Sequence, residues 1–397
     1  MFALKKRFEY ILKHNSCIQF LYKSIMSCIF RIIGLFIKTD NSLILFNSFG
    51  GKKYNDSPRV LFETMLQDNR FNDCQFVWAF EKPDNYMIPN AKKIKIDSFE
   101  YFVEALKAKV WISSVNIERG LHFKKKNTIY LNTWHGAGTK KIGNACNGRK
   151  DYDFSSVDMM LVQSDFERDI FIRDFLCNPE AIRMIGFPRN DELFHISNDK
   201  HIELRKQFRI PISKKVILYA PTWRDSKDGG LSYEFIPPMH INKWKSVLSD
   251  EYVMLFRMHT FTTRFEMDYD EFAIDVSAYE NLNHILAITD VLITDYSTIV
   301  YDAAIAGIPF ICFGFDYDTY REERGFYFDL NDVYPGGVLK TEDEVINRIP
   351  DVINGIDRKL FIAFRDRYIQ AGGAATEQIL SELSIKLQKV KNESTNS

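Results

Sequence analysis

From residue 41 to residue 391, short apolar runs rich in β-branched and aromatic residues alternate with segments of helical periodicity. This alternation is typical of proteins in which each helix connects two parallel strands. We predict strands at 43–49, 75–80, 92–96, 110–113, 128–134, 160–163, 184–187, 216–220, 253–258, 272–276, 291–294 and 310–313. The predicted helices include 58–66, 99–108, 165–175, 241–248, 283–288, 298–306 and 342–353. The sequence therefore predicts a parallel α/β fold.

A polar, charge-mixed stretch at 190–215 divides this alternation into two series. We expect an N-terminal segment at 1–40, a first domain at 41–195, a second domain at 196–391 that ends in two helices, and a disordered tail at 392–397. The 397 residues, 46% of them apolar, are enough for two packed domains. Ligands of doubly wound sheets bind outside the carboxyl ends of the strands, so a cleft between the domains is expected.

The overall charge gives no sign of a polyanionic partner. Lys and Arg number 52 against 53 Asp and Glu, so no global field attracts nucleic acid. The six cysteines show no Cys-x-x-Cys pair and no zinc-like spacing, and we expect them to be reduced thiols. Asp-x-Asp pairs occur, but none clearly follows a predicted strand. We therefore expect no metal site.

The N-terminal segment is the exception to this charge balance. Its seven Lys and Arg residues face only Glu9 and Asp40, and its apolar residues mostly recur at three- and four-residue steps, as in an amphipathic helix. The densest apolar run, 25–37, has 13 residues and contains Arg31. A membrane-spanning helix needs roughly 20 apolar residues. We expect a helix that lies on an anionic membrane surface, with packing against the protein body as the alternative.

Two kinds of polar motif follow predicted strands. The string Thr-Asp-Tyr-Ser-Thr at 294–298 opens a predicted helix, where free N–H groups and hydroxyls favour a phosphate; an ordinary cap needs only one such residue. His135 ends another predicted strand and precedes two glycines and a lysine pair, which favours a catalytic or ligand-binding role over a structural one. Arg257 and His259 repeat this placement in the second series and suit phosphate charge.

Taken in order, six motifs between residues 132 and 329 resemble the family of CDP-glycerol glycerophosphotransferases, which build teichoic acids and related polymers. They are Trp134-His135-Gly136 with Lys140; Gly-Phe-Pro-Arg-Asn-Asp at 186–191; Tyr-Ala-Pro-Thr-Trp-Arg at 219–224; Arg257-x-His259; 294–298 with Tyr301-Asp302; and Pro309, Asp316, Tyr320 and 324–329. The chain departs from the family pattern at 137–139, where Ala-Gly-Thr stands in place of the usual Thr-Pro-Leu.

The resemblance implies a GT-B fold, with two Rossmann-like domains facing a cleft, an N-terminal acceptor domain and a C-terminal domain that binds CDP. It implies peripheral attachment to the cytoplasmic face of the cell membrane. The implied reaction transfers glycerol phosphate from CDP-glycerol to a hydroxyl of a lipid-linked or saccharide acceptor and releases CMP. We expect it to need no cofactor, because CDP-glycerol is a substrate.

The matching positions give each candidate residue an expected role. The expected catalytic residues are His135 and His259. Expected to bind the donor and its phosphates are Arg257, Thr294, Asp295, Ser297, Thr298, Thr222, Arg224, Asp302 and Arg324. Expected on the acceptor side are Gly136, Lys140, Lys141, Arg189 and Asn190.

Other functions remain open on the sequence alone. A transferase of ribitol phosphate or another polyol phosphate would use the same motifs, and so would a sugar transferase of the same fold in capsule synthesis. A non-catalytic adaptor on the membrane surface is a further alternative. It is disfavoured because His135 and Ser297 are both present.

Overall fold

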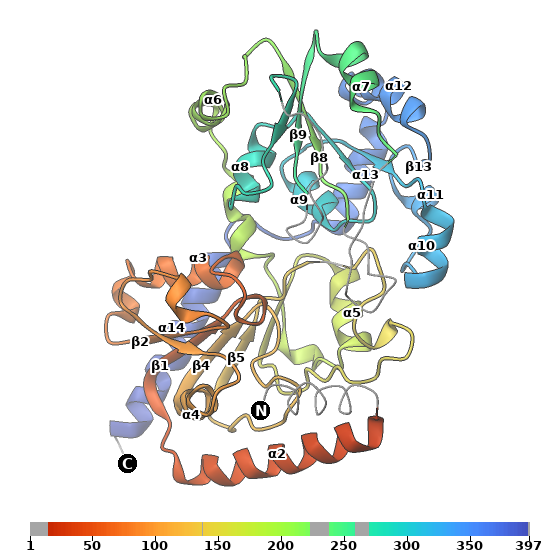
Figure 1. Ribbon diagram of the computed structural model, residues 1–397. Helices are drawn as coiled ribbons and strands as arrows, with labels where there is room; N and C mark the ends of the chain where they lie inside the picture. The colour runs from red at the N-terminus through yellow and green to blue at the C-terminus, as the bar shows by residue number, and fades with distance from the viewer. Residues whose placement is uncertain (1–14, 137, 223–237, 259–269, 396–397) are drawn as a thin grey trace.

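The first domain is built on a parallel sheet of seven strands in the order β3-β2-β1-β4-β5-β6-β7 (Figure 1). The computed structural model describes residues 15–136, 138–222, 238–258 and 270–395. The strands are β1 Asp40–Asn47, β2 Gln75–Phe80, β3 Ala91–Lys95, β4 Ala108–Ser113, β5 Ile129–Asn132, β6 Met159–Val162 and β7 Ile182–Met184. Apolar clusters cover both faces of this sheet, which explains why its central strands read as continuous apolar runs.

The second domain repeats this plan with a parallel sheet of six strands in the order β10-β9-β8-β11-β12-β13. The strands are β8 Lys215–Tyr219, β9 Tyr252–Phe256, β10 Ala273–Asp275, β11 Val291–Thr294, β12 Phe310–Phe313 and β13 Val338–Leu339. Each strand predicted from the sequence overlaps one of the observed strands, and the parallel α/β fold is confirmed. Among the strands of the described residues, the short β13 alone was not predicted.

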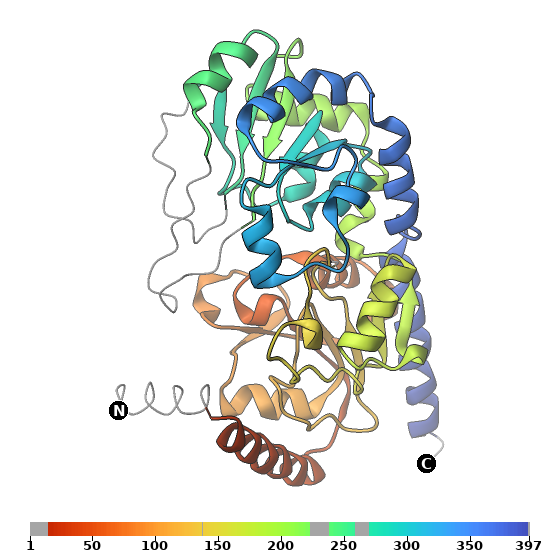
Figure 2. The ribbon, with the colours of Figure 1, turned by 90° about the vertical axis from the view of Figure 1, so that its right-hand side faces the viewer.

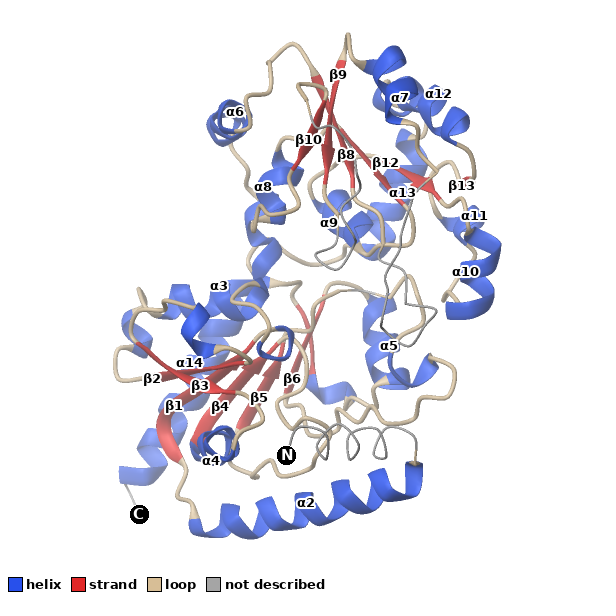
Figure 3. Cartoon of the chain, viewed as in Figure 1, coloured by secondary structure: helices blue, strands red, loops and turns tan. Residues whose placement is uncertain are grey.

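Helices connect the strands and cover both faces of each sheet (Figure 3). Those of the described residues are α2 Ser16–Phe36, α3 Asp56–Met65, α4 Phe99–Lys107, α5 Asp165–Asp174, α6 Asn198–Gln207, α7 Ile241–Leu248, α8 Leu282–Ala287, α9 Ile299–Ile305, α10 Tyr317–Arg324, α11 Leu330–Val333, α12 Glu342–Ile353, α13 Arg358–Tyr368 and α14 Ala375–Thr395. Several begin at a capping side chain that accepts a backbone N–H, as Ser98 does for α4 and Ser164 for α5.

The strand order of each sheet reverses once, between β1 and β4 in the first domain and between β8 and β11 in the second. The loops that follow β1, β5, β8, β9 and β11 all contribute residues to the same space between the domains. The carboxyl ends of the strands of both sheets thus point toward the space between the domains. Ligands of doubly wound folds bind at these ends.

The C-terminal helix departs from the expected domain division. Helix α13 packs on α9 in the second domain, but α14 returns to the first domain and lies against α3 and β1 (Figure 2). Its side chains Ile379, Leu380, Leu383 and Leu387 are buried in the core of the first domain. The helix also runs on to Thr395, so residues 392–395 are helical where we expected a disordered tail. Residues 396–397 lie outside the described part of the chain.

The two passages of the chain between the domains touch each other. The first contains Gly186 and Phe194, and the second contains Gly372 and Gly373. A Cβ added to Gly186 would lie 2.7 Å from the Cα of Gly372, and one added to Gly372 would lie 2.5 Å from the Phe194 ring. Glycine at these two positions therefore allows the passages to lie in contact.

Helix α2 lies along the outside of the first domain, with Phe30 buried against Phe102 and Phe123. The helix that we expected near the N-terminus is present, although residues 1–14 lie outside the described chain. Its apolar part is longer than we expected. Cys17–Phe36 spans 20 residues and is long and apolar enough, by length and composition only, to cross a membrane.

Candidate functional site

A cleft of about 1000 Å³ lies between the two domains. The first domain contributes Phe49, Lys53, Asp56, His135 and Arg189 to its walls. The second contributes Arg257, Ser297, Thr298 and Asp302. The imidazole and the phosphate-binding candidates, which are far apart in sequence, therefore share one cavity.

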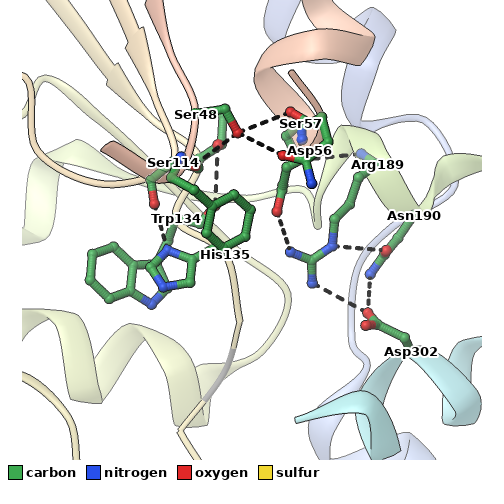
Figure 4. Close-up of polar contacts among 12 residues, drawn as sticks. Ser48, Asp56, Ser57, Ser114, Trp134, His135, Arg189, Asn190 and Asp302 are labelled. Atoms are coloured by element: carbon green, nitrogen blue, oxygen red, sulfur yellow. Dashed lines mark hydrogen bonds and ion pairs between the residues drawn. The ribbon is translucent and has the colours of Figure 1, made fainter. Parts of the chain in front are cut away.

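His135 follows β5 and is held from several sides (Figure 4). Its Nδ1 lies 2.6 Å from the carbonyl oxygen of Ser114, which can only accept a hydrogen bond. Its ring packs on Trp134, at 4.5 Å between centroids, and on Phe49, at 5.0 Å. Because Nδ1 must carry the proton of this bond, Nε2 of the neutral ring has a lone pair available to accept a proton.

Burial controls the ionisation of His135. Removal from water lowers the pKa of its imidazole below the usual 6.5, although the Ser114 carbonyl and the charge of Asp56 oppose this shift. The backbone just before it is strained, since Trp134 has a φ of 48°. The side-chain oxygen of Asn132 accepts the Trp134 N–H at 2.8 Å and holds this turn. The ring is therefore neutral near pH 7 and fixed in orientation.

The loop after His135 meets the second domain at the start of α9. A Cβ on Gly136, whose φ is 154°, would lie 3.0 Å from the hydroxyl oxygen of Thr298. The Ser297 hydroxyl accepts the N–H of Ile299 at 3.4 Å and also lines the cleft, so the two interpretations of the 294–298 motif, cap and ligand site, are compatible. Because Gly136 has no side chain, the loop that carries His135 can approach Thr298. The imidazole and the hydroxyls of Ser297 and Thr298 therefore line the same cleft where the two domains meet.

Arg257 supplies positive charge to the opposite wall. Its Nη1 donates to the carbonyl oxygens of Tyr279, at 2.6 Å, and Val276, at 3.2 Å. Burial lowers the pKa of this guanidinium, which nevertheless remains charged near neutral pH. It forms no ion pair with any carboxylate in the part of the chain that the structure describes. A guanidinium anchored by backbone oxygens is suited to bind an anion in the cleft.

Arg189 forms a bridge between the domains (Figure 4). It contacts Asp56 of the first domain at 3.2 Å and Asp302 of the second at 3.3 Å, and Asn190 donates to Asp302 at 2.8 Å. Burial opposes the charge of Arg189, but the two carboxylates outweigh it and hold its pKa above the ordinary value. We expected Asp302 on the donor and Arg189 and Asn190 on the acceptor, whereas here these side chains bind one another.

Three of the expected donor-side residues support the loop after β8. The Thr294 hydroxyl is buried and donates to the Ala220 carbonyl at 2.7 Å. One carboxylate oxygen of buried Asp295 accepts the N–H of Thr222 at 2.7 Å and that of Tyr296 at 2.6 Å. None of the three lines the cleft. Their placement shapes the wall at Ala220 and Pro221, which do line it.

The lysine pair and Arg324 also lie away from the cleft lining. Lys140 forms an isolated antiparallel bridge with Phe326, and the Lys141 N–H donates to the Gly325 carbonyl at 3.1 Å. Arg324 ends α10 and is exposed. Lys140 and Lys141 thus join the domains at a second contact. The remaining candidates, His259 and Arg224, lie outside the described residues.

Sequence reasoning missed the loop after β1, which contributes Phe49, Lys53 and Asp56 to the cleft. A signal was available, because Phe49 precedes two glycines and two lysines at a strand end, much as His135 precedes Gly136, Gly138 and a lysine pair. Phe49 and Asp56 both have positive φ values, of 46° and 62°. The described residues contain no group of three or more His, Cys, Asp and Glu side chains that could hold a metal ion.

Comparison with known proteins places these observations in a family. The family model for CDP-Glycerol:Poly(glycerophosphate) glycerophosphotransferase matches residues 29–384. The teichoic acid glycerol-phosphate transferase of Staphylococcus aureus is 32% identical over 352 residues, which cover 83% of this chain and 89% of that protein. The teichoic acid poly(glycerol phosphate) polymerase of Staphylococcus epidermidis is 32% identical over 380 residues, 87% of this chain but 51% of the polymerase. This chain thus spans about half of that larger relative.

A solved structure, that of the wall teichoic acid polymerase TagF, is similar along the whole chain. The TM-score is 0.79 at 29% identity, and the match covers 97% of this chain and 98% of that one. The GT-B fold expected from the motifs is confirmed.

Proposed function

The chain belongs to the CDP-glycerol:poly(glycerophosphate) glycerophosphotransferase family, and we propose that it transfers glycerol phosphate from CDP-glycerol to a hydroxyl of a lipid-linked or saccharide acceptor. The product would be part of a cell-surface polymer of the teichoic acid kind. The names of the two relatives favour glycerol phosphate over ribitol phosphate as the transferred group.

One observation supports this proposal above the others. An imidazole with Nε2 able to accept a proton lines the same cleft as a guanidinium and two hydroxyls of the opposite domain. Phosphoryl transfer requires that the nucleophile be positioned and the charge of the phosphates be neutralised, with little covalent help from the protein. His135 meets the first need, and Arg257, Ser297 and Thr298 meet the second.

In the proposed reaction, the acceptor hydroxyl oxygen attacks the phosphorus that carries glycerol. A new P–O bond forms, the bond to the bridging oxygen of the diphosphate breaks, and CMP leaves with that oxygen. His135 Nε2 takes the proton of the hydroxyl, a step that typically contributes 10² to 10⁴-fold in rate. The neutral state of the half-buried ring is the one that this role requires.

Arg257 and the hydroxyls of Ser297 and Thr298 would bind the diphosphate and the charge that develops on the leaving group. His259 and Arg224 remain candidates for the same task. The proposal assigns charge neutralisation to these side chains and not to a metal or a cofactor. Activity should therefore survive excess EDTA, and its loss on chelation with recovery on adding Mg²⁺ would contradict this part of the proposal.

The reaction can be tested directly with the purified full chain. CDP-glycerol, CDP-ribitol and a UDP-sugar are each incubated with a lipid-linked acceptor, and released CMP or UDP is measured. We expect CMP from CDP-glycerol and the added mass of glycerol phosphate on the acceptor. CMP release from CDP-ribitol alone would identify a ribitol-phosphate transferase, UDP release a sugar transferase, and no release with any donor an adaptor.

We also propose that the protein works at the cytoplasmic face of the cell membrane through α2. This helix exposes a row of large apolar side chains, among them Ile25, Ile29, Ile32, Leu35 and Phe36. Such a surface, next to basic residues, favours an interface with anionic lipid. Replacing Ile32 and Leu35 with Asp should abolish sedimentation with vesicles containing phosphatidylglycerol. The same change at Ile385, an exposed apolar residue of α14, should not.

A further inference from the structure

Lys53 is a cation that the proposed reaction leaves without a role. It lies on the loop between β1 and α3 and lines the cleft together with His135 and Arg257. Its Nζ lies 5.8 Å from the centroid of the Phe49 ring, and that ring lies 5.0 Å from the ring of His135. The ammonium is therefore separated from the proposed base by one aromatic side chain.

The charges around Lys53 are unusual for an exposed lysine. Burial in the cleft wall lowers the pKa of its ammonium, and the positive charge of Arg257 from the other domain lowers it further. The charge of Glu280 opposes this shift, but its carboxylate pairs with Arg59, at 3.7 Å, and not with Lys53. Within the ranges that the structure describes, Lys53 forms no ion pair. Lys92 of the same domain, by contrast, contacts the carboxylates of Glu100 and Glu104, each at 2.8 Å.

Lys53 and Arg257 line the same cleft from different domains, and two cations so placed repel unless an anion lies between them. In a protein whose donor carries a diphosphate, the anion that suits this arrangement is a phosphate. We propose that Lys53 and Arg257 together bind one phosphate group between the domains, beside His135, so that Lys53 is a substrate-binding residue of this enzyme. This inference rests on the proposed function and extends it to a residue of the acceptor-side wall.

The phosphate has two possible sources with the same chemistry. It is either part of the donor diphosphate or a phosphate ester near the attacking hydroxyl of the acceptor. In the second case Lys53 would make the enzyme select acceptors that already carry a polyol phosphate. Soluble probes separate the two cases, with CDP representing the donor and glycerol 3-phosphate representing the end of a phosphate-bearing acceptor.

The test compares three variants of the full chain by calorimetric titration with CDP and with glycerol 3-phosphate. Lys53→Met removes the charge and keeps most of the length of the side chain, while Lys53→Arg keeps the charge. Lys52→Met is the matched control, because Lys52 is the exposed neighbour that does not line the cleft. We expect Lys53→Met to weaken one of the two probes about tenfold, Lys53→Arg to recover most of that loss, and Lys52→Met to bind as the parent does.

Each outcome has one meaning. Weaker CDP binding assigns Lys53 to the donor diphosphate, and weaker glycerol 3-phosphate binding assigns it to the acceptor. Unchanged binding of both probes by Lys53→Met would overturn the inference even if CDP-glycerol is turned over normally. If the parent protein releases no CMP but the loss of Lys53 still weakens binding of inorganic pyrophosphate, the anion site stands and the proposed function fails.

Discussion

The two walls of the cleft hold their functional groups in different ways. On the first-domain wall, His135 and Arg189 are fixed by contacts from several elements, including Ser114 and Asp56. On the second-domain wall, Arg257 is anchored through backbone carbonyls, and Ser297 and Thr298 simply lie where β11 passes into α9.

The difference follows from what each wall is proposed to do. A proton acceptor needs one orientation and a suitable pKa, and both come from burial and specific partners. Anion binding needs positive charge and donors that still face the cavity, so their other contacts must be few. Substitutions on the first wall should therefore affect rate or stability strongly, while those on the second should affect affinity more moderately.

The largest effect is expected at the base. His135→Ala should lower turnover at least about a hundredfold, because no other described side chain on this wall offers a fixed imidazole at the strand end. The melting temperature should change little, as the ring is only partly enclosed. Steady-state rates of CMP release and a thermal unfolding curve measure the two quantities. Near-normal turnover would remove His135 from the mechanism.

Loss of the ion pairs that Arg189 forms between the two walls should lower the stability of the fold. Arg189→Met leaves Asp56 and Asp302 without their shared cation and should lower the free energy of unfolding by about 3 kcal/mol. Arg168→Met is the control, since Arg168 pairs with Asp165 and Asp169 on an exposed face of α5 and should matter by less than about 0.5 kcal/mol. Urea titration of both variants measures the loss in free energy of unfolding. Equal losses would mean that the bridge stabilises the fold no more than an exposed ion pair does.

On the second wall, replacing Ser297 and Thr298 with Ala should weaken CDP binding by about 1 to 3 kcal/mol if their hydroxyls bind phosphate. Ser246→Ala, on α7 away from the cleft lining, should bind CDP as the parent does. Calorimetric titration with CDP measures the affinity of each variant. Unchanged affinity in the double variant would leave Ser297 with only its contact to the Ile299 N–H.

The smallest effect concerns pH. Since burial lowers the pKa of His135 in the folded chain, the unfolded chain binds a proton first as pH falls. The contribution to stability is therefore full above pH 6.5 and is lost as pH falls from there toward the lower folded pKa. Turnover should likewise persist somewhat below pH 6.5. Urea titrations at pH 7.5 and 5.5 should show that the free energy of unfolding falls less in His135→Gln than in the parent protein. An equal fall in both proteins would mean that other groups cause the pH dependence.

The sequence predicted the strands well because buried parallel strands are apolar without interruption, as in 291–294 and 310–313, whose ends match β11 and β12. Helix α6 was not predicted, because it is polar on most of its surface and buries only Leu204 and Arg205. The return of α14 to the first domain was not predictable either. An amphipathic pattern shows that a helix has an apolar face but not which domain covers it.

At the site, single motifs predicted which residues approach the cleft but not what they bind. His135, Arg257 and Ser297 line it as expected. Arg189 and Asp302 also reach it, but whether two opposite charges contact a ligand or each other depends on how the domains meet. Lys53 was missed because the recognised motifs begin near residue 132, and the likeness of 49–53 to the loop after β5 emerges only when the two strand ends are compared.

The path of α14 has a consequence for biosynthesis. The core of the first domain includes Ile379 and Leu383, which follow the whole second domain in the sequence. The domain whose sheet is translated first therefore cannot complete its packing until the second domain has been translated. The first domain cannot be obtained intact by ending translation before the second, because part of one face of its sheet stays uncovered until α14 is made.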